Sequence, residues 1–110
     1  MSGGHFNYKQ HYLNDICEEL EEVINKNGIE KTLAEIKAEN FFVDLDNKYE
    51  VSFYKYDYNY NKETIEEFKK AIKILKLAKT YADRIDYLLS GDDGEESFIY
   101  RLKEEIKLLD

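Results

Sequence analysis

Apolar residues recur at helical spacing throughout residues 61–90, and this is the strongest pattern in the chain. One stripe has members three, four or seven residues apart, and a second stripe lies beside it. The first consists of Ile65, Phe68, Ile72, Leu75, Ala82, Ile85 and Leu89, and the second of Ala71, Ile74, Ala78, Tyr81 and Leu88. A helix of this length would run roughly 40 Å. The pattern therefore predicts one long helix with a wide apolar face, along which the other elements pack.

Shorter helical patterns precede and follow this stretch. Asn7 and Gln10 have capping-box spacing, and Asn27-Gly28 offers a helix end, so a first helix is expected between them. A second, short helix is expected over about 29–39. After Ser90-Gly91, Asp93 and Glu96 again have capping-box spacing, which predicts a last helix that folds back as an αα-hairpin.

Between residues 40 and 60 the apolar period changes to two. Residues 41–45 and 49–54 alternate around a possible turn at 46–48, which favours a β-hairpin over about 41–56. Tyr54, Tyr56, Tyr58 and Tyr60 continue the alternation and would line one side of an extended segment. The sequence thus predicts a single domain over 1–110, mainly α, around the 61–90 helix and with one β-hairpin.

Composition and charge narrow the class of protein. The chain has 110 residues, a net charge of −8 and one cysteine. Excess negative charge argues against a nucleic-acid backbone as the partner, because phosphates need cationic neutralisation. A lone Cys17 fits a reducing compartment, and no apolar run is long enough for a membrane span. A cytoplasmic protein without a membrane partner is expected.

Motifs for catalysis or metal binding are weak. No nucleophile motif, phosphate loop or di-iron pair is present, so we expect no enzyme, no catalytic residue and no cofactor. His5, His11 and Cys17 lack a recognised zinc spacing. The acidic turn at residues 90–97 does not match a calcium loop, and helix capping accounts for most of it, with partner binding as the alternative.

Tyrosine is the more informative residue. Ten tyrosines in 110 residues is a high usage, and tyrosine suits recognition surfaces because it combines contact area, few rotors and a polar tip. Tyr56, Tyr58 and Tyr60 are equally compatible with a half-buried strand face and with an exposed one. Exposed tyrosines beside acidic helices would suit a cationic groove on another protein.

Both ends of the chain resemble a family of small hypothetical proteins from bacteriophages and prophages. The likeness lies in SGGHFNYKQ at the start and in the stretch from Glu63 to Ile106, above all RIDYLLSGDDGEESF. Tyr87 and Ile99 stand where relatives would have Trp and His. The resemblance implies a setting inside a host bacterium, without a defined activity. It also implies that the two ends meet, which places His5 and Phe6 near Arg84, Asp86 and Asp92. Asp93, next in the chain, is a further candidate binding residue.

Three functions follow as hypotheses. The first is a phage-derived protein that acts by stoichiometric contact with a host protein, for example as an inhibitor of a bacterial defence system. The second is a sponge for a small nucleotide signal, using His5, Arg84 and tyrosine stacking. Lys69, Lys73 and Lys76 could add phosphate contacts, although their spacing equally fits a solvated helix face. The third is a homo-oligomeric helical module, because the face of the 61–90 helix is wide for its short neighbours.

Overall fold

The computed structural model describes residues 4–109, which form five helices joined by turns and irregular segments. They are α1 (His11–Lys26), α2 (Leu33–Glu39), α3 (Lys48–Tyr54), α4 (Lys62–Leu89) and α5 (Glu95–Leu108). The prediction of a mainly α protein is confirmed within these residues.

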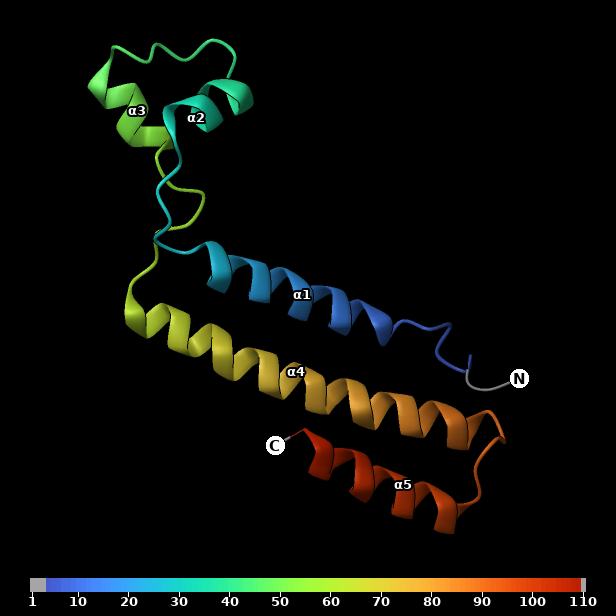
Figure 1. Ribbon diagram of the computed structural model, residues 1–110. Coiled ribbons are helices and arrows are strands. Elements are labelled where there is room, and N and C mark those ends of the chain that lie inside the picture. Colours follow the sequence, from blue (N-terminus) through green and yellow to red (C-terminus); the bar gives the residue numbers. More distant parts are fainter. Residues whose placement is uncertain (1–3, 110) are drawn as a thin grey trace.

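Helices α1, α4 and α5 lie side by side as a single layer, with α4 in the middle (Figure 1). α1 and α5 each run antiparallel to α4, on opposite sides of it. We call residues 33–54, with α2 and α3, the distal lobe. It stands beyond the end of the layer where α1 ends and α4 begins, on two connecting segments, 27–32 and 55–61, which we call the neck.

The long helix was correctly predicted to within a residue at each end. Its first turn is capped by Asn61, whose Oδ1 accepts a hydrogen bond from the Thr64 N–H at 2.8 Å. At the other end Gly91 adopts φ +82°, a left-handed conformation that lets the chain reverse. The predicted αα-hairpin with α5 is also confirmed.

Two predicted capping boxes are wrong. α1 begins at His11 and not near Asn7, because residues 4–10 form turns in which Asn7 and Tyr8 have positive φ angles of 55° and 59°. α5 is capped by Gly94, without a side-chain hydrogen bond. Asp93 is instead buried and bound to arginines, so its carboxylate is not at the helix start.

The predicted β-hairpin at 41–56 is also wrong, since the described residues contain no strand. Residues 48–54 form α3, whose start is capped by Asn47: its Oδ1 accepts from the N–H groups of Tyr49 and Glu50. An alternating pattern specifies a strand only when one face is buried against something. Here Tyr49 and Phe53 both stay exposed, so a strand would bury no apolar face. The Asn47 cap therefore favours the helix over the strand.

The second helix is shorter than predicted. It starts at Leu33 because Thr32 and Glu35 form a reciprocal capping box, so residues 29–32 stay outside the helix.

The core is small for a chain of this size. The buried apolar side chains among the described residues are Cys17, Val23, Ile36, Val43, Ile72 and Leu102. The Cα radius of gyration is 20.7 Å, with extents of 66 × 28 × 15 Å. A compact domain of this length has a radius of about 13 Å. The molecule is therefore open and thin, and much of its apolar surface faces outward.

Candidate functional site

Asp86, near the end of α4, binds the N-terminal segment. The N–H groups of Gly4 and His5 donate to its carboxylate at 3.1 and 2.6 Å, and the Gln10 side-chain amide donates at 2.8 Å. The Ser90 hydroxyl, four residues along α4, is the fourth donor at 3.2 Å. The expected meeting of the two ends of the chain is thus confirmed for His5 and Asp86.

The surroundings of Asp86 favour its charged form. Only 1% of the residue is exposed. Burial alone raises the pKa of the carboxyl, but the hydrogen bonds from Gln10, Gly4, His5 and Ser90 together outweigh it, so the pKa lies below its ordinary value. With four donors around it, this carboxylate acts as an attachment point for the N-terminal segment.

Arg84, two residues before Asp86 on α4, belongs to a separate, charge-balanced cluster. Its guanidinium stacks over the Tyr87 ring at 4.3 Å, and it is only 7% exposed. Its Nη1 lies 3.5 Å from Asp93 and its Nε 3.6 Å from Glu105. Arg101 reaches the same Asp93 carboxylate at 3.4 Å. These pairs tie α4, α5 and the turn between them together.

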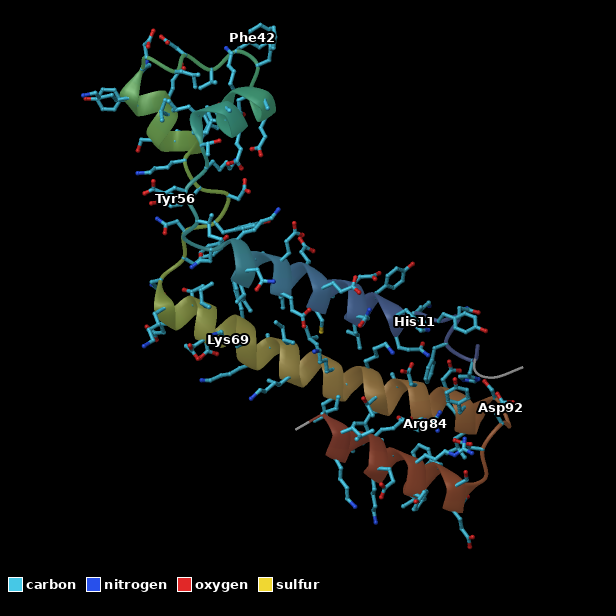
Figure 2. All side chains as sticks on the ribbon, in the orientation of Figure 1. His11, Phe42, Tyr56, Lys69, Arg84 and Asp92 are labelled. Atoms are coloured by element: carbon cyan, nitrogen blue, oxygen red, sulfur yellow. The ribbon has the colours of Figure 1, made fainter. Side chains whose placement is uncertain are left out.

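His5, Phe6 and Asp92 lie at the same end of the molecule. The His5 ring is exposed and meets Phe6 edge-on at 5.1 Å. Phe6 is half-buried and lines an apolar groove on α4 with Tyr81. Asp92 is exposed in the turn after α4, and its N–H donates to the Tyr87 carbonyl (Figure 2).

The predicted tyrosines lie at the opposite end of α4, in the neck (Figure 2). The Tyr56 hydroxyl donates to Glu30 at 3.2 Å. Tyr58 and Tyr60 stack on each other at 6.3 Å, and Tyr60 meets Phe68 of α4 edge-on at 5.6 Å. Tyr56 and Tyr58 are half-buried and Tyr60 is 47% exposed, and Tyr60 joins the neck to the layer through Phe68.

Asn27 aligns the two segments of the neck. Its side chain accepts from the Tyr60 N–H at 2.7 Å and donates to the Tyr60 carbonyl at 3.1 Å. Two backbone bonds, Gly28 N–H to Tyr58 and Lys31 N–H to Lys55, continue the pairing. The candidate site residues thus form two groups, and the structure does not bring Arg84 and the tyrosines together as one ligand site.

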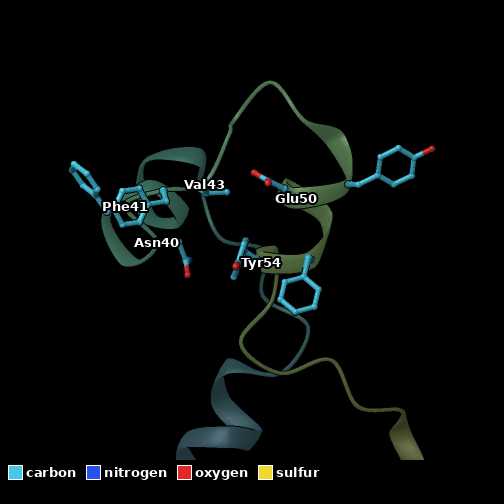
Figure 3. A pocket seen from close by; sticks show the side chains of 8 residues that line it. Asn40, Phe41, Val43, Glu50 and Tyr54 are labelled. Atoms are coloured by element: carbon cyan, nitrogen blue, oxygen red, sulfur yellow. The ribbon is translucent and has the colours of Figure 1, made fainter.

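The distal lobe carries an aromatic surface that the sequence interpretation missed. Phe42 is 93% exposed, Tyr49 89%, Phe53 79% and Phe41 76%. They line an open cavity of about 580 Å³ between α2 and α3 (Figure 3). The available signal was Asn47, whose cap turns 48–54 into a helix; in the predicted hairpin the same aromatics were assigned to strands.

The lobe is also acidic. Residues 33–54 contain five carboxylates and two lysines. Glu50 lies beside the cavity and accepts a hydrogen bond from the Asp44 N–H at 2.6 Å (Figure 3). Exposed aromatic rings surrounded by negative charge are a surface suited to protein contact, in which rings fill pockets and carboxylates meet cationic groups.

Other chemistry finds little support in the structure. Within residues 4–109, His, Cys, Asp and Glu side chains nowhere gather in threes close enough to hold a metal ion. Cys17 is buried and its Sγ faces the Ile72 carbonyl; burial raises the pKa of this thiol, which lowers its reactivity. None of the described helices combines the length and the apolar character needed to cross a membrane.

Comparisons of the chain with known protein families, with curated proteins and with solved structures found no match.

Proposed function

We propose that this protein acts by stoichiometric contact with another protein, and that the aromatic face of the distal lobe makes the contact. The observation that carries the proposal is the exposure of Phe41, Phe42, Tyr49 and Phe53 on one small lobe. Contiguous exposed aromatics are uncommon on proteins that work alone, and they mark interaction sites. The resemblance to phage proteins supplies the setting, in which the partner is a host protein such as a component of a bacterial defence system.

The neck supports this role because it holds the lobe away from the layer. Lys31 makes ion pairs with Glu39 of the lobe and with Asp57 of the other neck segment. Lys55 pairs with Glu30 at 3.2 Å. A partner can therefore approach the aromatic face without meeting the layer. The chemistry favours an apolar groove bordered by lysine or arginine.

The nucleotide sponge receives less support. Arg84 is only 7% exposed, and its charge is already balanced by ion pairs with Asp93 and Glu105. Lys69 and the neck tyrosines lie at the other end of α4 (Figure 2).

The test uses one multiple variant and one control. Phe42→Ala, Tyr49→Ala and Phe53→Ala together remove the proposed anchors, while Tyr100→Ala removes an exposed tyrosine from α5. Both should keep the helical content, since all four residues are exposed. Each true anchor contributes about 2 kcal/mol, or roughly thirtyfold in Kd.

The expected result is that the wild type and Tyr100→Ala protect phage in a strain carrying the relevant defence system and retain the captured host protein, whereas the lobe variant does neither. A lobe variant that protects and binds like the wild type would contradict the proposal.

A further inference from the structure

A second surface of the molecule, on the layer, also exposes apolar side chains, although less fully than the lobe does. Its exposed apolar side chains lie on one side of α4 and continue onto α5 and the N-terminal segment; we call them the apolar face. It consists of Phe6, Ile74, Leu77, Ala78, Tyr81 and Leu109. Ile74 is 65% exposed, which is high for a central position of the longest helix.

The opposite side of α4 is polar. Lys69, Lys76 and Asp83 recur there every seven residues, and Lys76 makes an ion pair with Glu21 of α1 at 3.3 Å. The layer as a whole is therefore amphipathic: one face is polar, with Lys69, Lys76 and Asp83, and the other is the apolar face. Domains are built from at least two packed layers because such a face must be buried against another. Within residues 4–109 no element covers it.

The exposed area indicates how much surface is missing a partner. The chain exposes 8359 Å². A folded monomer of 13.1 kDa exposes about 6,400 Å², so the excess is about 2,000 Å². The extended lobe and neck share this excess with the apolar face, and it exceeds the roughly 800 Å² per partner that a standard interface buries.

We propose that two copies of this chain pack apolar face to apolar face, with their α4 helices antiparallel. We choose a second copy as the partner because the apolar face is uncovered in every folded chain, and another copy of the chain is always present to cover it. Ala78 lies near the middle of α4, where a small side chain lets two helices approach closely. The result is a two-layered, twofold assembly in which every contact is made twice.

Charge sets the direction. The turn at 90–97 carries four carboxylates and no base, and three of these carboxylates, Asp92, Glu95 and Glu96, are exposed. Parallel packing would bring the acidic turns of the two copies together, whereas antiparallel packing through Ala78 keeps them at opposite ends of the assembly. Antiparallel packing also directs the two distal lobes to opposite ends, so the dimer would offer two aromatic contact surfaces.

The first test measures mass in solution. We expect the wild type to sediment at twice the 13.1 kDa chain mass. Ile74→Glu with Ala78→Glu should give a monomer with unchanged helical content, because both positions are exposed in the single chain. Phe42→Glu, in the lobe, should remain dimeric. A monomeric wild type, or dissociation by Phe42→Glu in place of the α4 variant, would overturn the proposal.

The second test needs no disruptive substitution. Ala78→Cys should form an intermolecular disulfide on mild oxidation, since the two copies of this position would face each other across the twofold axis. Lys69→Cys, on the polar side of α4, is the control and should not cross-link. The native Cys17 is buried and does not compete. Equal cross-linking at both positions, or none at Ala78→Cys, would count against the arrangement.

Discussion

At the scale of single residues, Asp86 shows how a buried charge is made useful. Its carboxylate receives donors from two backbone N–H groups, one amide side chain and one hydroxyl. A buried carboxylate without such partners would be costly, and here the partners come from residues 4–10. The N-terminal segment is therefore held by Asp86, including the turn in which Asn7 and Tyr8 adopt left-handed backbone angles.

Replacing Asp86 with Asn should release this segment. The amide keeps the shape but lacks the charge and has only one acceptor oxygen, so at least one donor is left without a partner. We expect a lower unfolding temperature and faster hydrogen exchange at the Gly4 and His5 amides. The control is Asp83→Asn, which weakens a partly buried ion pair with Lys79, whose two side chains are 25% exposed, and should change stability less. Equal effects of the two substitutions would contradict this role for Asp86.

The same residue predicts a pH dependence. The pKa of Asp86 is lower in the folded chain than its ordinary value, so its stabilisation is complete above the unfolded value of about 4. The stabilisation is lost as the pH falls through the folded value. The difference in unfolding free energy between wild type and Asp86→Asn should therefore be constant near neutral pH and shrink in acid below about 4. A difference that grows on acidification would show the opposite sign of the pKa shift.

At the scale of elements, the sequence predicted those helices whose period and caps lie within the helix itself or directly beside it. The 61–90 helix follows from an uninterrupted helical period with Asn61 before it and Gly91 after it, and its boundaries were accurate. The alternation at 41–54 was ambiguous, because a period of two is informative only if a sheet exists to bury one face. α3 begins at the cap formed by Asn47, which accepts hydrogen bonds from two N–H groups in the first turn of the helix. In the sequence this short signal is less conspicuous than the longer alternation around it.

The candidate site was predictable only in part, for a related reason. The meeting of His5 with Asp86 was expected from the resemblance and not from any spacing between them. The pairing of Arg84 with Asp93 and Glu105 depends on how α5 lies against α4, which no local pattern specifies. Asp93 was consequently interpreted as a helix cap. The aromatic face of the lobe was missed together with α3.

The cap of the long helix gives a prediction at this scale. Asn61→Ala removes the oxygen that accepts from the Thr64 N–H and should lower the free energy of unfolding by about 1 kcal/mol. Asn59→Ala, two residues earlier and exposed, should leave it within about 0.5 kcal/mol of the wild type. Chemical denaturation of both variants checks this. A larger loss for Asn59→Ala would mean that the neck, and not the cap, controls stability.

At the scale of the whole molecule, two open surfaces dominate. The layer buries one stripe of each helix and leaves its apolar face uncovered, and the lobe exposes aromatic rings at the end of a narrow neck. A chain that folded into a compact globule would hide both. Contact with a partner through the lobe and pairing through the layer both require that the lobe does not fold back onto the layer.

Small-angle scattering from the single chain tests this requirement most directly. The Ile74→Glu, Ala78→Glu variant supplies the chain without its second copy, at concentrations where its mass is confirmed as 13.1 kDa. We predict a radius of gyration close to the 20.7 Å of the Cα trace. A value near the roughly 13 Å of a compact domain would mean that lobe and layer close on each other, and would contradict the account.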